Sequence, residues 1–494
     1  MYVTKSQNQL LNIFLLLKCR TDCDIILVKF INLPCCLGGG TEMKKILPLL
    51  LALLSLCTVF TLSSAAVENE VAVMLDGYNI EFDVPARIIE MSGASRTMVP
   101  VRKIFEALGA EVGWEGSTRT VSAKRGNDTV SLSIGSTELY KNGSLVSKLD
   151  VPAMIVEEEG ESRTLVPVRA ISEAFGCKVD WDGESRTAII TDINDDTVLI
   201  VDRFPVSADF YRYFRFNTAN TLGIREDDEY DNEMLKSATV KSICEYYSMQ
   251  KTASEYGRTP YSAEVKSKVN SVFDKYKGYY GDTFDKVLAD TGMTEEIFRN
   301  VLTVSHFEDE ILESVREVTL ATPAEDRVNE LMNDDGYIRA THILFTDRES
   351  AEAAYKKAAD ATDAEFIEMA KTLGADAGLA ANDGSYYFSE GTMIEEFEDA
   401  AFDLKEGETS GIVESEKFGY HIIRRLPKDR EYIAANIDEM YFFKMAANFK
   451  KYVYTELAQE LEGKVIATEK YASASKESIT DMKSAIEAKM KNEA

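Results

Sequence analysis

The chain has 494 residues and carries 84 acidic against 55 basic side chains, a formal net charge of −29. This length predicts several domains, each large enough to bury its own core. The acidic balance excludes nucleic acid as a partner and argues against docking on an anionic membrane surface.

The first predicted element is a secretory signal over 43–66. Met43-Lys44-Lys45 precedes an apolar run from 46 to 62 and the small residues Ser63-Ser64-Ala65-Ala66, which are the three regions of a signal peptide. We expect cleavage after Ala66, and contact with a membrane only if this segment stays uncleaved. Leu56 precedes Cys57 where a lipobox requires a small residue, so a lipoprotein is not expected. The sequence predicts export, to the medium or to the outer face of the cytoplasmic membrane.

Residues 1–42 are predicted to be a mis-assigned leader. Gly38-Gly39-Gly40-Thr41-Glu42 is what a purine-rich ribosome-binding site gives when it is read as protein, so we expect translation to start at Met43; a genuine unusual leader is the alternative. Of the seven cysteines only Cys177 and Cys244 then belong to the exported chain. A disulfide framework is therefore not expected.

An internal repeat occupies 67–195, with units at about 72–135 and 137–192. The run Ser95-Arg96-Thr97-Met98-Val99-Pro100-Val101-Arg102 recurs 67 positions later as Ser162-Arg163-Thr164-Leu165-Val166-Pro167-Val168-Arg169. Each unit predicts a strand, a short helix and further strands. Trp114 and Trp181 are equivalent, and we expect both in a shared core because one unit alone has too little core.

These repeats resemble the copper amine oxidase N-terminal domain, a stalk found on exported bacterial proteins. The resemblance implies a spacing or attachment role, with a cell-wall component as a candidate partner. Amine oxidation is not implied, because no histidine lies in or near the repeats to bind copper, and neither a metal nor another cofactor is expected. Cys177 aligns with Ala110, which predicts a small buried side chain rather than a reactive thiol.

The segment 200–335 has helical periodicity. Apolar side chains follow each other at the spacing of one helix face at Val240, Ile243, Cys244 and Tyr247. Thr294 before two glutamates predicts the start of a helix that carries His306, where Glu310 one turn later favours a surface or partly paired imidazole over a catalytic one.

Two further histidines, His342 and His421, lie in short apolar, β-branched tracts that predict buried strands, and thus imidazoles built into a core beside a site. Between them come two helix-like stretches, a loop from Asp376 to Gly384, and the run Gly391-Thr392-Met393-Ile394-Glu395-Glu396-Phe397-Glu398-Asp399-Ala400-Ala401-Phe402. This arrangement over 336–428 resembles the parvulin family of peptidyl-prolyl isomerases, whose signature has the form G-x-M-x-x-x-F-E-D-A-A-F.

The resemblance implies roles for particular residues. His342 and His421 correspond to the histidine pair at the floor of the active site, and Asp376 is the candidate for the family's catalytic Cys or Asp. The expected substrate-binding residues are Met393, Phe397, Tyr386, Phe402 and Glu416. Met393 and Phe397 are four apart and are expected on one helical face.

Departures from the family pattern bear on activity. Tyr386 stands where the pocket usually has Leu, and Glu416 occupies a position that is often Thr, with Ser415 as the alternative source of a hydroxyl after a shift of one residue. Both positions line the expected site. The departures from the family residues at these positions favour low isomerase activity over high.

The whole chain is predicted to be a multidomain α+β protein, with a signal peptide, an α+β stalk, a helical chaperone-like domain, a parvulin-like α/β domain with an antiparallel sheet, and a helical tail over 429–494 whose first half returns to the helical domain. This order resembles foldases of the SurA and PrsA type. It implies an exported prolyl isomerase and foldase acting on unfolded or proline-containing polypeptides. The alternative is a weak or inactive parvulin that acts as a holdase or a cell-surface binding protein.

Overall fold

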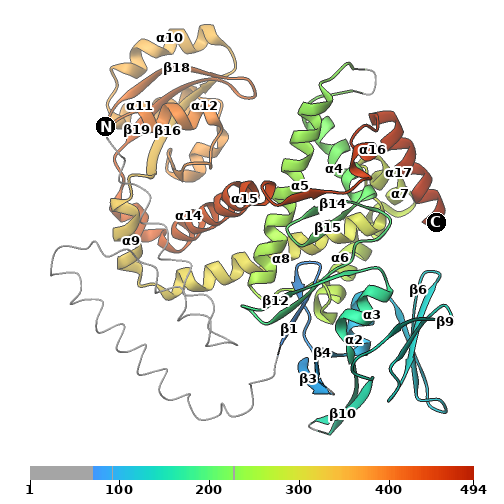
Figure 1. The fold of residues 1–494 in the computed structure, drawn as a ribbon. Helices are drawn as coiled ribbons and strands as arrows, with labels where there is room; N and C mark the ends of the chain where they lie inside the picture. The colour runs from blue at the N-terminus through green and yellow to red at the C-terminus, as the bar shows by residue number, and fades with distance from the viewer. Residues whose placement is uncertain (1–70, 92, 159, 226–227, 494) are drawn as a thin grey trace, which may run out of the picture. The chain divides into compact units, whose positions relative to one another are not determined.

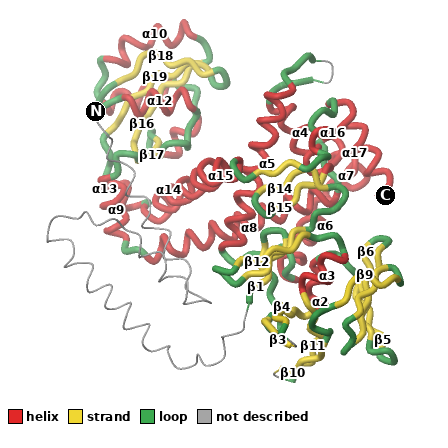
Figure 2. The backbone as a smooth tube through the Cα atoms, in the orientation of Figure 1, coloured by secondary structure: helices red, strands yellow, loops and turns green. Residues whose placement is uncertain are grey.

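The computed structural model describes residues 71–493 except 92, 159 and 226–227, so the predicted leader and signal segment lie outside the described residues. Two compact units make up the described part: one joins the residues up to His306 with those from Leu461 onward, and the other is Phe307–Glu460 (Figure 1). Both contain helices and antiparallel strands (Figure 2). The predicted α+β class is therefore confirmed.

Three sheets and two short helices form the segment from 72 to 191, and the strand that follows them belongs to a separate sheet. Their bounds are β1 (Ala72–Leu75), β2 (Tyr78–Asn79), β3 (Arg87–Met91), β4 (Ala94–Pro100), α2 (Val101–Ala107), β5 (Glu111–Glu115), β6 (Thr120–Arg125), β7 (Asp128–Ser133), β8 (Glu138–Lys141), β9 (Ser144–Lys148), β10 (Met154–Glu158), β11 (Glu161–Pro167), α3 (Val168–Ala174), β12 (Lys178–Asp182), β13 (Thr187–Thr191) and β14 (Thr197–Val201). The sheets have the strand orders β12-β13-β1-β2, β10-β11-β4-β3 and β5-β6-β7-β8-β9.

The two halves of this segment are interleaved rather than stacked. In the antiparallel pair β4 and β11, Val99 lies directly opposite Val166, its counterpart 67 positions later. Ion pairs cross between the halves in the same way, from Arg96 to Asp150 and from Arg163 to Asp83. One core of aliphatic and aromatic side chains from both halves lies between the sheets. Neither half contains that core by itself.

The prediction that both tryptophans belong to this core is correct for the face on which they lie but wrong for their burial. Trp114 and Trp181 point to the core-facing side of β5 and β12, opposite buried Val121 and Ala188. Each strand is the edge of its sheet, so 48% of Trp114 and 41% of Trp181 stay exposed. The sequence pattern gave the correct face but could not show that these strands have a neighbour on one side only. Cys177 is buried, as expected.

The turn between β1 and β2 packs against the helical part of the same unit. Tyr78 is buried and its hydroxyl donates to Gln250, while the Ser254 hydroxyl donates to the Gly77 carbonyl at 2.7 Å. Gly77 has φ +82°, and a Cβ there would lie 2.3 Å from the Phe204 ring. Glycine is thus required by backbone conformation and by space.

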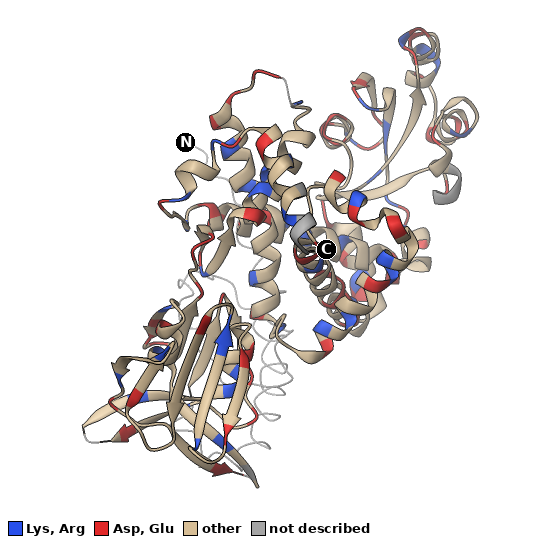
Figure 3. Cartoon of the chain, turned by 90° about the vertical axis from the view of Figure 1, so that its right-hand side faces the viewer, with Lys and Arg blue, Asp and Glu red and all other residues tan. Residues whose placement is uncertain are grey.

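Helices dominate after β15 (Phe204–Ser207). They are α4 (Ala208–Thr221), α5 (Asn232–Glu255), α6 (Ala263–Tyr280), η2 (Gly281–Thr283), α7 (Phe284–Asp290), α8 (Glu295–Ala321) and α9 (Ala324–Asn333). The predicted start of α8 is confirmed, because Thr294 Oγ1 accepts the Ile297 N–H at 3.2 Å. Acidic and basic residues are interspersed along these helices (Figure 3).

The tail is not wholly helical as predicted. Its elements are α13 (Arg430–Ala435), α14 (Ile437–Lys451), η4 (Tyr452–Leu457), α15 (Ala458–Glu462), β20 (Val465–Ala467), α16 (Tyr471–Ala474) and α17 (Ile479–Glu493). β20 pairs antiparallel with β14. Its three residues, Val465-Ile466-Ala467, are too few to show a strand period. α13 and α14 pack on α9, whereas α16 and α17 pack on α4.

The segment that holds the two histidines is a four-stranded antiparallel sheet of order β17-β16-β19-β18. Its elements are β16 (Tyr337–Phe345), α10 (Arg348–Ala359), α11 (Asp363–Leu373), η3 (Ala377–Asn382), β17 (Tyr386–Ser389), α12 (Glu395–Asp403), β18 (Thr409–Ser415) and β19 (Gly419–Leu426). α10 and α11 pack on one face through Ile343 and Ile422, and α12 packs on the other through Ile338 and Ile423.

Among the helices that the structure describes, none is both long and apolar enough to cross a membrane.

Candidate active site

The central strands β16 and β19 bring the two histidines together on the face covered by α12. The register pairs His342 with Ile423 and Leu344 with His421, so the histidines are diagonal neighbours on one face. Both are buried, at 5% and 3% exposure. The rings are nearly parallel, 12° apart, and their Nδ1 atoms are 2.9 Å apart. The predicted pairing of two buried imidazoles in strands matches this geometry.

Asp376 and Tyr386 extend the contact on the His342 side. Asp376 Oδ2 lies 2.9 Å from His342 Nε2 and accepts the Tyr386 hydroxyl at 2.7 Å, while Oδ1 accepts the Gly378 N–H at 2.8 Å. The N–H of Ala375 donates to the Leu344 carbonyl, which ties the loop to the end of β16. The sequence predicts Tyr386 as a substrate-binding residue in a position that is usually Leu. Its hydroxyl makes it part of the polar network.

Ser415 completes the network on the His421 side. Its Oγ lies 3.1 Å from His421 Nε2 and also accepts the Phe418 N–H at 3.2 Å. Glu416, the residue expected in the site, is exposed in the turn between β18 and β19. Because side chains alternate along a strand, the last residue of β18 faces inward and the next faces solvent. The alternative with Ser415 as the hydroxyl is the one that fits the geometry.

The donors and acceptors in this network follow one order. A carboxylate only accepts, so Nε2 of His342 donates to Asp376. If the His342 ring is neutral, its Nδ1 accepts from His421 Nδ1–H. Nε2 of His421 is then an acceptor for the Ser415 hydroxyl. This order requires two neutral rings, each with a single proton. All four ring nitrogens have a partner within the protein.

The pKa shifts agree with neutral histidines. Burial lowers the pKa of His342, although the Asp376 carboxylate partly offsets it. Burial, followed by the proximity of His342, lowers the pKa of His421 to about 4. Burial acts to raise the pKa of Asp376, but hydrogen bonds from His342, Tyr386 and Gly378 together bring it below its ordinary value. At neutral pH the site therefore holds one carboxylate and two uncharged imidazoles.

Apolar side chains lie beside the imidazoles. The ring of Phe397 is 4% exposed, with its centroid 5.1 Å from that of His342 and 5.7 Å from that of His421. Met393 packs on the same cluster, and Phe402 contacts Phe388 behind it at 5.9 Å. The expectation that Met393 and Phe397 share a helix face is wrong, because α12 begins at Glu395. Met393 lies in the loop before it.

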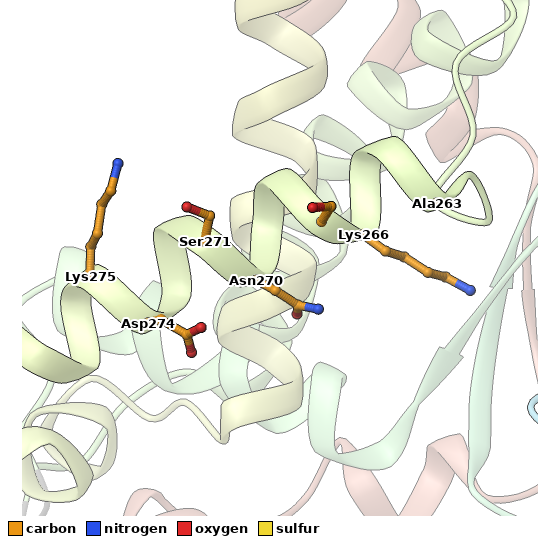
Figure 4. A pocket seen from close by; sticks show the side chains of 7 residues that line it. Ala263, Lys266, Asn270, Ser271, Asp274 and Lys275 are labelled. Carbon is orange, nitrogen blue, oxygen red and sulfur yellow. The ribbon is translucent and has the colours of Figure 1, made fainter.

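Other candidate sites are less informative. Among the described residues, no cluster of three or more His, Cys, Asp or Glu side chains could hold a metal ion. His306 lies on α8, as predicted. A shallow pocket on α6 is lined by small and charged side chains from Ala263 to Lys275, and in the close-up those of Lys266 and Lys275 extend away from each other (Figure 4).

Comparison with known families agrees with this geometry. Residues 342–426 match the model of the PPIC-type PPIase domain, and residues 74–201 match that of the copper amine oxidase N-terminal domain. The chain thus carries a parvulin-type peptidyl-prolyl cis-trans isomerase domain and a domain similar to the copper amine oxidase N-terminal domain.

Several curated proteins named foldase protein PrsA are similar to part of this chain. Foldase protein PrsA 1 of Lactobacillus johnsonii is 26% identical over 206 residues, 41% of this chain and 66% of that protein. Foldase protein PrsA of Exiguobacterium sibiricum is 34% identical over 173 residues, 34% of this chain and 54% of that protein. The first eight curated relatives are matched over 52% to 69% of their own length.

Two solved structures are similar to parts of this chain. The crystal structure of PrsA from Bacillus anthracis shares 25% identity and is covered to 96%, against 45% of this chain, with a TM-score of 0.24. The solution structure of NmPin, the parvulin of Nitrosopumilus maritimus, shares 41% identity and is covered to 96%, against 18% of this chain, with a TM-score of 0.17.

Proposed function

We propose that the chain is an exported peptidyl-prolyl isomerase and foldase that accelerates rotation about X-Pro bonds in unfolded polypeptides. The proposal is carried by one observation: the apolar ring of Phe397 lies next to two neutral histidines whose ring nitrogens all have hydrogen-bond partners. The Asp376 carboxylate ends this chain of hydrogen bonds. The relatives named foldase support the same reading.

The reaction needs no covalent intermediate. The planar amide resists rotation by a barrier of about 20 kcal/mol because rotation breaks its resonance. An enzyme lowers this barrier by binding the twisted amide more tightly than either planar form. Phe397 and Met393 offer an apolar surface for the proline ring. Excluding water from the amide there removes hydrogen bonds that stabilise the planar carbonyl.

We propose that Asp376 supplies the electrostatic part. The carbonyl oxygen carries more negative charge in the planar amide than in the twisted one, so a nearby carboxylate destabilises the planar form more. The histidines have no free ring nitrogen to offer a substrate. Their role is then to fix Asp376 and to form the floor under Phe397.

A protease-coupled or NMR exchange assay on a proline peptide tests the function. Wild type is expected to accelerate isomerisation, and His342→Ala, Met393→Ala and Phe397→Ala are expected to lower kcat/KM. The alternative function is that of a holdase with an inactive isomerase domain. One observation favours it: the Tyr386 hydroxyl already donates a hydrogen bond to the Asp376 carboxylate, which the proposed mechanism needs next to the substrate. No acceleration by folded wild type would select it.

For the stalk we propose attachment to a cell-wall component. Its support is the pair of half-exposed tryptophans at equivalent positions, Trp114 and Trp181, because exposed indole faces are common contact surfaces. Co-sedimentation of the full chain with cell walls tests this, with Trp114→Ala and Trp181→Ala expected to reduce the bound fraction. Equal sedimentation of the double variant and wild type would exclude the tryptophans as the contact.

A further inference from the structure

The loop that carries Met393 is held by one carboxylate. Glu398, on the first turn of α12, accepts hydrogen bonds from three consecutive backbone N–H groups, those of Gly391, Thr392 and Met393. The last two are 3.0 Å long. At the same time its own N–H donates to the Ile394 carbonyl, as the helix starts.

These hydrogen bonds restrain the loop. Gly391 has φ +81°, so the chain reverses there and turns its successive N–H groups toward one point. Such a concave run of N–H groups binds an anion, and Glu398 provides that anion from within the chain. Without it, three donors would need water or would be left unpaired. The apolar cluster alone does not bond these N–H groups.

The consequence reaches the apolar surface of the site. Met393 carries the last of the three bonded N–H groups, and its side chain packs on the cluster that contains Phe397. Phe397 precedes Glu398 in the chain and contacts both imidazoles. One residue therefore connects the loop side and the helix side of the surface proposed for the proline ring.

We infer that Glu398 is a positioning residue for proline binding, acting through Met393 rather than on the substrate. This inference rests on the proposed function. Because small displacements of binding groups reduce catalysis strongly, loss of the carboxylate should act on the use of substrate more than on folding. Glu398→Gln keeps the size of the side chain but replaces one acceptor oxygen by a donor that faces other donors.

The test compares Glu398→Gln with Glu395→Gln, a control on the same helical turn whose side chain is exposed. We expect Glu398→Gln to lower kcat/KM about tenfold, mainly through KM, and to speed amide hydrogen exchange at Thr392 and Met393. Glu395→Gln should change neither. Unchanged kcat/KM and unchanged exchange in Glu398→Gln would overturn the inference.

A double-mutant cycle separates positioning from a general effect. If Glu398 acts through Met393, the Glu398→Gln change should cost less than twofold in kcat/KM when Met393 is already Ala. Additive effects would overturn the inference. Failure of the proposed function gives a different result, because wild type would then not accelerate isomerisation. Amide exchange and the Kd of a proline peptide would still show whether Glu398 positions the loop.

Discussion

Replacing Tyr386 by Phe removes one hydroxyl and leaves the ring in place. That hydroxyl donates to the Asp376 carboxylate at 2.7 Å. Hydrogen bonds to charged groups contribute about 1.5–3 kcal/mol. The Asp376 side chain is 23% exposed, so water replaces part of the loss, and we expect the free energy of unfolding to fall by about 1–2 kcal/mol. Asp376 keeps its bonds to His342 and Gly378. The position of the carboxylate is thus maintained, and kcat/KM should change less than threefold.

The assay is urea unfolding together with the isomerase assay, and the chain provides a matched control. The neighbouring Tyr387 uses its hydroxyl to accept the Asp429 N–H at 3.3 Å, a longer bond between neutral groups. Tyr387→Phe should cost only about 0.5 kcal/mol. Equal stability of the two variants would refute the energetic reasoning. A loss of kcat/KM above tenfold in Tyr386→Phe would show that its hydroxyl acts on the substrate.

Three further predictions concern protons and the Ser415 hydroxyl. The pKa of His421 is about 4 in the fold and 6.5 in the unfolded chain, so its contribution to stability is complete above pH 6.5 and is lost as pH falls toward 4, by roughly 3 kcal/mol. Urea unfolding of wild type between pH 7 and 4.5 should show a decline in the free energy of unfolding, and His421→Gln should reduce that decline. Ser415→Ala leaves His421 Nε2 without its donor and should lower the free energy of unfolding by about 1 kcal/mol, measured at pH 7, whereas no change would mean that water replaces the hydroxyl. Burial, then the charge of Asp192, raises the pKa of Asp76 to about 7, so its contribution declines as pH rises from about 4 through 7; Asp76→Asn should raise the melting temperature at pH 8 more than at pH 5, and an equal shift at both would contradict this.

The strand tracts around His342 and His421 could be predicted because apolar, β-branched runs bury both faces of a central strand. The network beyond them could not. A tyrosine in place of Leu reads as a larger apolar side chain, and only the loop that returns Asp376 to β16 shows that its hydroxyl has a partner. Ser415 and Glu416 differ by one position, which inverts the face, and the sequence does not fix that register.

Larger departures have a similar cause. Met393 has helical spacing to Phe397, yet the helix starts at Glu395 because the Glu398 carboxylate binds the N–H groups before it. The spacing of apolar residues indicates which side chains can share a helix face, but it does not show at which residue the helix begins. The half-exposed Trp114 depends on which strand lies at an edge, and that is set by pairings between distant segments.

The strand β20 gives the order in which the chain can finish folding. The Thr468 hydroxyl donates to the Thr197 carbonyl, 271 positions earlier, and β20 closes the open side of β14. β14 can pair with β15 as soon as both have been made, but its other edge stays unpaired until β20 has appeared. The segment between them, with its own sheet, can fold in the meantime. A prematurely ended chain would then expose a free strand edge, the kind of surface on which proteins aggregate.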